Sequence, residues 1–361
     1  MRRSVLLLAL ALVVTACGQP KSGPVNANPA ALGETDLPVL GGSEPILGVD
    51  LYAPKNYTAA QVTADGERTL AYIKNVLKAN AVGIVWNFFA ASYYSEAVEA
   101  TSATLSASNV GILTKIATQD HLLVEYRPLI QVPSTPDNWE GRINPYSQDE
   151  WFNNYYRVEL PYLRLAQQLG VREFVTATEM YDLNSSTLWP SFFTRISQVY
   201  HGVISYTSWD GNYFGSAPGT SFQVARPGLL PTKYLGMDMY WHMNLPAAAT
   251  TVQVTASWEA LFGKVPPSVL HRTAIDETGI QAREGAYAKP QDLAAPGIGS
   301  DQVQANWFTA ACATVRRYHM RGVFFFKVDL ADNPAHPAKS LSTFEGREGA
   351  GAISECAQAL H

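Results

Sequence analysis

The sequence predicts an α/β protein built as a single (β/α)8 TIM barrel, and three observations indicate this fold class. The chain has 361 residues, of which 47% are hydrophobic and 16% charged, as in globular rather than disordered proteins. Eight short apolar runs rich in Val, Ile, Tyr and Phe alternate with segments of helical period. The runs start at intervals of about 30 to 50 residues, the length of one βα unit.

The first 44 residues are expected to lie outside the barrel. Two arginines precede an apolar run that is too short to span a bilayer as a mature helix, which is typical of a secretory signal. The run ends in Val14-Thr-Ala-Cys17, which resembles the lipobox of bacterial lipoproteins. We expect residues 1–16 to be removed and Cys17 to be lipidated. The alternative is an ordinary signal with an incidental cysteine.

Residues 17–44 are rich in Gly, Pro, Ala and Asn and are expected to form a flexible tether. The barrel domain is then expected at residues 45–361. The lipid is the only membrane contact expected. These features predict an exported protein that is lipid-anchored to the periplasmic or extracellular face of a bacterial membrane.

The predicted strands are the eight apolar runs, at Ile46–Tyr52, Ala81–Phe89, Leu122–Val132, Glu173–Tyr181, Gly202–Trp209, Tyr234–Trp241, Leu270–Glu277 and Gly322–Leu330. An open doubly wound sheet is the competing arrangement. Its Gly-rich phosphate-binding fingerprint is missing after the first run, so the closed barrel is favoured.

The clearest predicted helix is Glu150–Gly170, where apolar side chains recur every three or four residues and Gly170 provides a C-terminal cap. Other segments of helical pattern are Thr63–Ala79, Ser191–Tyr200, Thr255–Phe262, Gln302–His319 and Ala352–Leu360. The glycine cluster at Gly346–Gly351 is interpreted as a turn leading into the last helix, with an anion site as the alternative.

Composition and motifs exclude several classes of function. The net charge of −5, without a basic cluster beyond the N-terminus, argues against nucleic acid as a partner. No H-E-x-x-H or G-x-S-x-G motif occurs, so we expect no metal, no cofactor and no serine nucleophile. Cys312 and Cys356 allow a disulfide or two buried thiols. A monomer is expected.

Polar and aromatic residues gather where the predicted strands end, which in a barrel is the catalytic face. Carboxylates interleaved with Trp and Tyr are typical of sugar sites, because aromatic rings cover the C–H faces of pyranoses while polar groups bind their hydroxyls. The candidate substrate-binding residues are Asp50, Trp86, Arg127, Trp139, Thr178, Trp209, Asp238, Tyr240, Trp241 and Lys327.

Structural roles remain open for several of these residues. Core packing is the alternative for the three tryptophans on strands, and barrel-end hydrogen bonds are the alternative for Asp50 and Asp238. Arg127 is equally consistent with a structural ion pair, and a salt bridge with Asp329 is the favoured role of Lys327. Trp139 lies in a loop and is therefore expected to be exposed.

Two glutamates are the candidate catalytic pair. Glu179 ends the fourth predicted strand and Glu277 the seventh, so they can face each other across a bound sugar. Carboxyl groups about 5 Å apart would act as acid and nucleophile in a retaining mechanism, in which the acid needs a raised pKa. Asp276 is expected to face away from Glu277, since adjacent strand residues alternate. The alternative is that each glutamate ends its strand in an ion pair.

The motifs around these glutamates resemble those of the retaining (β/α)8-barrel glycoside hydrolase clan, and most of all glycoside hydrolase family 113, the endo-β-1,4-mannanase family. The resemblance is carried by Trp139–Ile143, Phe174–Glu179, Gly236–Tyr240 and Glu277–Gly279. It implies that Glu179 is the acid/base and Glu277 the nucleophile, with Tyr240 hydrogen-bonded to the nucleophile.

Two positions depart from the pattern of the clan. Thr178 stands where many members have the Asn that binds the sugar 2-hydroxyl, and the last strand has Phe324–Asp329 where many members supply a Trp floor. The resemblance predicts a retaining glycoside hydrolase that cleaves β-linked, mannan-like polysaccharide or oligosaccharide. The alternative is a non-catalytic carbohydrate-binding lipoprotein on the same barrel.

Overall fold

The computed structural model describes residues 45–135, 138–214, 234–336 and 340–360. The chain divides into two units, residues 1–37 and 38–361, and all described residues belong to the second. The predictions of a signal at residues 1–16, lipidation at Cys17 and a tether over 17–44 fall outside the described residues. No helix in the described part of the chain is both long and apolar enough to cross a membrane.

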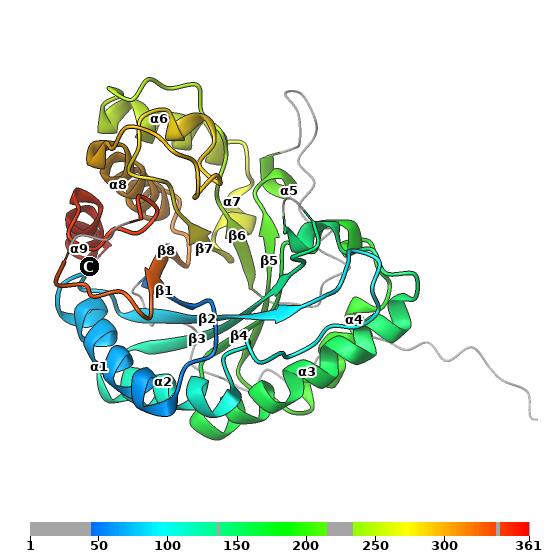
Figure 1. Ribbon diagram of the computed structural model, residues 1–361. Helices are drawn as coiled ribbons and strands as arrows, with labels where there is room; N and C mark the ends of the chain where they lie inside the picture. Colours follow the sequence, from blue (N-terminus) through cyan, green and yellow to red (C-terminus); the bar gives the residue numbers. More distant parts are fainter. Residues whose placement is uncertain (1–44, 136–137, 215–233, 337–339, 361) are drawn as a thin grey trace, which may run out of the picture. The chain divides into compact units, whose positions relative to one another are not determined.

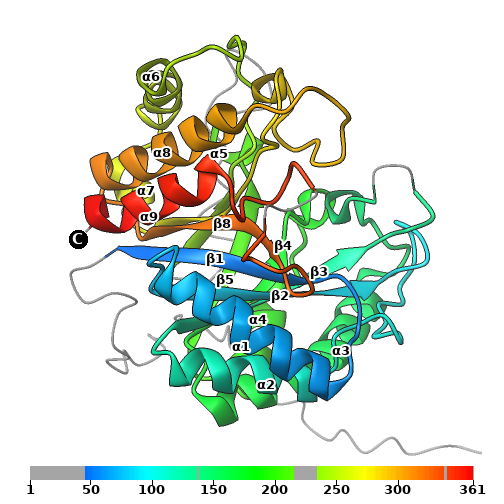
Figure 2. The same ribbon diagram turned by 60° about the vertical axis from the view of Figure 1, so that its left-hand side comes forward.

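Eight parallel strands close into a barrel, which confirms the predicted fold class. Their bounds are β1 Ile46–Ala53, β2 Ala81–Phe89, β3 Leu123–Gln131, β4 Glu173–Thr178, β5 Val203–Trp209, β6 Leu235–Asp238, β7 Thr273–Thr278 and β8 Gly322–Asp329. The ring is completed where β1 pairs with β8, with Ile46 opposite Gly322. Figures 1 and 2 show the helices on the outside of these strands.

The major helices are α1 Ala59–Asn75, α2 Ala107–Gln119, α3 Gln148–Leu169, α4 Trp189–Ser197, α6 Thr251–Phe262, α8 Asp301–Arg317 and α9 Glu348–Leu360. Short helical segments are α5 Gly211–Phe214, α7 Pro267–Leu270, η1 Glu140–Arg142, η2 Tyr181–Leu183 and η3 Ala286–Ala288. Neighbouring helices pack in chain order from α1 to α4, and α8 packs between α6 and α9 (Figure 1).

Helix boundaries follow local capping. The α1 helix starts at Ala59, four residues before the predicted start, because Thr58 and Gln61 form a reciprocal capping box. The α3 helix ends as predicted at Gly170, which adopts the left-handed conformation with φ 64°.

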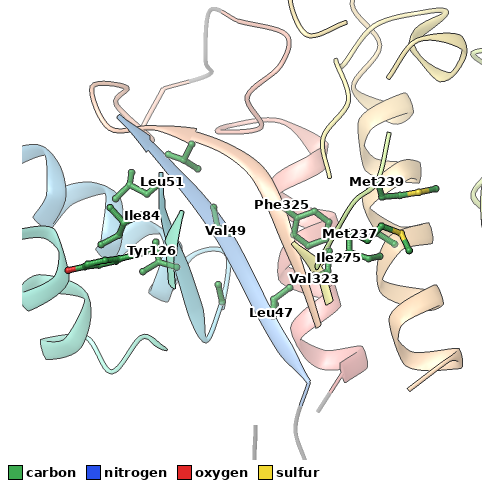
Figure 3. Packing of buried hydrophobic residues seen from close by; sticks show 14 of the residues in the cluster. Leu47, Val49, Leu51, Ile84, Tyr126, Met237, Met239, Ile275, Val323 and Phe325 are labelled. Atoms are coloured by element: carbon green, nitrogen blue, oxygen red, sulfur yellow. The ribbon is translucent and has the colours of Figure 1, made fainter. Parts of the chain in front are cut away.

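The strands send side chains alternately to the helices and to the barrel interior. Leu47, Val49 and Leu51 occupy alternate positions of β1 and join the main hydrophobic cluster beneath the helices (Figure 3). Gly48 lies on the opposite face, where a Cβ would stand 2.2 Å from the ring of Phe324. Asp50 shares this inner face, so one strand supplies both a hydrophobic layer and a polar interior.

Cys312 of α8 and Cys356 of α9 form a disulfide, with their Cα atoms 5.7 Å apart. The sequence left this bond and two free thiols equally open. Both residues are buried between packed helices. The disulfide therefore links the last two major helices of the barrel.

Candidate active site

A cavity of about 600 Å³ opens at the C-terminal ends of the strands, the face on which barrel enzymes carry their chemistry. It is lined by eight residues predicted for the site: Trp139, Thr178, Glu179, Trp209, Asp238, Tyr240, Trp241 and Glu277. Strands β4 to β7 and the loop that follows β3 supply these side chains. The barrel therefore brings both candidate catalytic glutamates to one cavity.

Two groups hold the carboxylate of Glu277. The hydroxyl of Tyr240 donates to Oε1 at 2.6 Å, as the resemblance implied, and a guanidinium nitrogen of Arg127 lies 3.2 Å from Oε2. The Glu277 side chain is only 13% exposed, so these contacts are poorly screened by water. Positive charge and a hydrogen bond thus stabilise the anion in the position from which a nucleophile would act.

Arg127 is fully buried and joins several parts of the site. Besides contacting Glu277, it forms an ion pair with Asp238 at 2.5 Å and donates to the backbone carbonyl of Asp276 at 2.6 Å. The carboxylate of Asp276 instead accepts a hydrogen bond from Thr207 at 2.7 Å. Arg127 therefore fixes the position of Glu277 from beneath the cavity, and Asp276 binds a different partner.

Glu179 follows β4 in a left-handed backbone conformation with φ 52°, which is uncommon for residues other than glycine. Its amide donates to the carbonyl of Thr207 at 2.8 Å, and its carboxylate accepts a hydrogen bond from the indole nitrogen of Trp139. The tight bend turns this side chain into the cavity at the point where the strand ends.

Burial and the negative charge of Glu277 together raise the pKa of Glu179 to about 8, with burial the larger cause. The hydrogen bond from Trp139 acts in the opposite direction, because it stabilises the ionised form. At neutral pH the Glu179 carboxyl is therefore mostly protonated. One glutamate of the pair can donate a proton while the other carries negative charge.

Aromatic rings form the walls of the cavity. Trp209 packs edge-to-face on Trp139, with ring centroids 6.1 Å apart, and on Tyr181 at 5.9 Å. On the β6 side, Trp241 stacks on His242 at 5.3 Å. These tryptophans are partly exposed, in contrast to those in the core. Both walls present ring surface to a ligand in the cavity.

Two acidic residues of the cavity were not predicted as site residues. Glu140 of η1 is buried, and burial together with the charge of Glu179 raises its pKa well above the usual range. Asp210 accepts a hydrogen bond from the backbone amide of Tyr240 at 2.8 Å, and burial raises its pKa to about 7. In the sequence each directly follows a predicted tryptophan, Trp139 or Trp209, and Asp210 also lies among the polar residues at the end of the fifth predicted strand.

Trp86 was wrongly included among the candidate sugar-binding residues. It is fully buried, stacks on Tyr162 of α3 at 4.7 Å between centroids and meets Tyr126 edge-on. Its ring therefore fills the layer between the sheet and the helices, away from the cavity. This is the core-packing alternative considered from the sequence.

Asp50, Arg127 and Lys327 also do not line the cavity. Asp50 lies inside the barrel, where its carboxyl group has no hydrogen-bond partner among the described residues, and burial raises its pKa well above normal. Lys327 forms a 2.6 Å ion pair with Asp329 and lies 4.2 Å from the centroid of the Tyr52 ring. Its favoured structural role is thus the one observed. Thr178 does line the cavity, and its hydroxyl has no partner in the described part of the chain.

No group of three or more His, Cys, Asp or Glu side chains in residues 45–360, apart from the undescribed gaps, is arranged to bind a metal ion.

Comparison with known families supports the resemblance found in the sequence motifs. The family model of Glycoside Hydrolase Family 113 matches residues 53–214, a stretch that includes Trp139 and Glu179 and ends before Glu277. A search of curated protein sequences found no match. The predicted resemblance to this family is confirmed by the matched segment.

Solved structures extend the likeness over the whole barrel. A family 113 β-1,4-mannanase has a TM-score of 0.70 and 16% identity, covering 87% of this chain and 99% of that chain. The family 113 β-mannanase of Alicyclobacillus acidocaldarius in complex with ManMIm has the same TM-score and identity, covering 88% of this chain and 98% of that chain. An exo-β-1,4-mannosidase from Opitutaceae bacterium strain TAV5 has a TM-score of 0.53 and 13% identity, covering 88% of this chain and 60% of that chain. At these identities the likeness establishes the fold.

Proposed function

We propose that this chain, a glycoside hydrolase of the family 113 type, cleaves β-linked mannan-like polysaccharide with retention of anomeric configuration. The observation that carries the proposal is the contrast between two glutamates of one cavity. Arg127 and Tyr240 stabilise negative charge on Glu277, whereas the pKa of Glu179 is raised to about 8. Retaining glycosidases need this pairing of a charged and a protonated carboxyl group.

In the first step, Glu179 donates its proton to the glycosidic oxygen while Glu277 attacks the anomeric carbon. The bond to the leaving sugar breaks, and a covalent glycosyl-enzyme ester forms. In the second step, Glu179 removes a proton from water as that water attacks the anomeric carbon and releases Glu277. Two displacements restore the original configuration.

The electrostatics support the change of role between these steps. Ester formation removes the negative charge of Glu277, which is one cause of the raised pKa of Glu179. The pKa of Glu179 is therefore lower in the intermediate than in the free enzyme, and the carboxylate that results can act as a base. The same residue is thus matched to proton donation first and to proton removal afterwards.

The substrate class rests on the walls of the cavity and on the comparisons. Partly exposed rings of Trp139, Trp209 and Trp241 suit the C–H faces of pyranoses. The solved structures described above include β-1,4-mannanases with the same fold. Thr178 provides a shorter polar group than the usual Asn, so the contact with the 2-hydroxyl is expected to differ from that of the clan.

Replacement of Glu277 by Gln tests the assignment. The amide of glutamine cannot attack the anomeric carbon, so turnover of β-1,4-mannan should fall at least about a thousandfold, while binding of mannan oligosaccharides persists. Glu284→Gln is the matched control, because Glu284 is exposed in the loop after β7 and outside the cavity. Normal turnover by Glu277→Gln would contradict the assignment. Binding without turnover by the unaltered protein would favour the non-catalytic alternative.

The stereochemical course is tested separately. Proton NMR of the first product should show the β-anomer, and azide should rescue a Glu179→Ala variant with formation of a β-glycosyl azide. Initial release of the α-anomer would contradict a nucleophilic Glu277.

We also propose that the protein is exported, lipidated at Cys17 and active as a monomer. The lipobox-like Val14-Thr-Ala-Cys17 supports the first two points, and the Cys312–Cys356 disulfide is the kind of bond that persists in oxidising compartments. Metabolic labelling with palmitate should mark the full-length chain and should fail for Cys17→Ala.

A further inference from the structure

Two tyrosine rings stack on each other at the protein surface, outside the cavity. Tyr94 is 52% exposed and Tyr146 is 85% exposed, yet their centroids are 5.5 Å apart with planes inclined by 22°. Burial of aromatic rings is normally favourable. Neighbouring aromatic side chains that stay exposed to solvent therefore indicate an interaction site. We refer to Tyr94 and Tyr146 as the tyrosine pair.

The backbone holds the tyrosine pair in place. Tyr94 belongs to the loop after β2 and Tyr146 to the segment between η1 and α3. The amide of Asn144 donates to the carbonyl of Tyr93 at 2.8 Å, and the amide of Ser147 donates to the carboxylate of Glu96 at 3.2 Å. The rings are therefore positioned before any ligand arrives, which lowers the entropic cost of binding.

The tyrosine pair lies on the same face of the barrel as the cavity. Loops after β2 and β3 both leave the C-terminal ends of parallel strands. Tyr146 follows Trp139, a wall of the cavity, by seven positions, which limits their Cα separation to about 25 Å even for a fully extended chain. A polysaccharide bound in the cavity can extend over a distance of that order.

We propose that the tyrosine pair is an accessory binding platform for a neutral β-linked polysaccharide whose scissile bond lies at Glu179 and Glu277. The inference rests on the proposed function and extends it to polymer recognition. Tyrosine faces bind pyranose C–H groups, and their hydroxyls can bond sugar hydroxyls. The segments around the pair carry Glu96, Asp149 and Glu150 against Arg142, which disfavours a polyanionic polymer.

Binding to insoluble β-1,4-mannan by the full-length chain tests the platform directly. Tyr146→Ala and Tyr94→Ala should each weaken the binding roughly fivefold to tenfold, and Tyr146→Phe should retain most of it, because the ring face remains. Val76→Ala is the matched control, since Val76 is equally exposed, at 52%, but lies at the end of α1 near the opposite face. It should bind mannan normally.

Kinetics distinguish a polymer platform from a defect in the cavity. For Tyr146→Ala, kcat/KM on soluble mannan should fall by a similar factor, while kcat/KM on mannotriose, a short substrate expected to occupy the cavity alone, should be unchanged. Unaltered mannan binding by both alanine variants, or an equal loss on mannotriose, would overturn the platform. If the unaltered protein lacks turnover but its mannan binding needs Tyr146, the platform stands and the proposed hydrolase function fails.

Discussion

Trp139 lowers the pKa of Glu179, whereas burial raises it. Its indole N–H donates to the carboxylate and so stabilises the ionised form, which lowers a pKa that burial and Glu277 raise to about 8. The local loop therefore adjusts the pH at which the acid loses its proton. In the proposed mechanism only protonated Glu179 donates to the leaving group, so the alkaline limit of activity should report this adjustment.

We expect Trp139→Phe to shift the alkaline limb of the kcat/KM profile to higher pH. Phenylalanine keeps a ring in the cavity wall but lacks the N–H donor, so the pKa of Glu179 should rise above about 8. The measurement is kcat/KM on a mannan oligosaccharide across the neutral and alkaline range. Trp241→Phe, on the opposite wall, is the control and should leave the limb in place. A shift to lower pH in Trp139→Phe would contradict the account.

Glu140 provides a second test of protonation at the cavity. Burial and Glu179 raise the pKa of Glu140 well above normal, which favours the uncharged acid. Glutamine has nearly the same shape and no charge. Glu140→Gln should therefore change kcat/KM at neutral pH by less than about tenfold, or about 1.4 kcal/mol. A much larger loss, measured with the same oligosaccharide, would contradict this expectation.

The ends of the predicted strands were sufficient to place Glu179, Tyr240 and Glu277 at the cavity, because the C-terminal ends of parallel strands meet at one face of the barrel. Trp86 was misplaced because both faces of β2 are buried, so the strand has no apolar–polar alternation to show which side a residue takes. Glu140 was missed because it lies on a short helical segment within a loop, where no periodicity assigns a direction.

At the scale of elements, the eight strands were predicted to within a few residues, whereas one major helix was not identified. The α2 helix contains Gly111 and several β-branched residues, so its intrinsic helix propensity is low. Packing against α1 and α3 provides the stabilisation that the local sequence lacks. The competing open sheet was excluded correctly by the missing phosphate-binding glycines.

The disulfide between α8 and α9 permits a prediction at this scale. Cys312 and Cys356 are 44 positions apart, so in the chain-entropy account the bond stabilises the fold by about 4 kcal/mol. Replacement of both cysteines by alanine should lower the free energy of unfolding in urea by that order. Dithiothreitol should destabilise the unaltered protein and leave the double variant unaffected. Equal stability of the two proteins without reductant would contradict a stabilising bond.

At the scale of the whole barrel, acids gather in the interior. Asp50, Glu125 and Asp276 lie inside near Arg127 and Arg321, and burial raises the pKa of each acid, for Asp276 to about 7. The folded protein therefore binds more protons than the unfolded chain between about pH 4 and 7, where the unfolded acids are ionised. Stability must then fall as the pH rises through that window.

We expect the urea midpoint of unfolding to be higher at about pH 5.5 than at about pH 8. Each buried acid that stays protonated in the fold contributes a slope of about 1.4 kcal/mol per pH unit. Asp50→Asn removes one such group, so its midpoint should depend less on pH than that of the unaltered protein. A midpoint that rises over this pH range would contradict the raised pKa values.

Pairing of β1 with β8 has a consequence for the order of events during synthesis. Ile46 finds its partner Gly322 only after nearly all of the chain has been made, so the barrel cannot close while the ribosome is still adding the earlier strands. Until then the growing sheet has two open edges, which are prone to pair with other chains. A nascent chain in this unclosed state can still be threaded through a translocation channel, so late closure is compatible with the export that we propose for this protein.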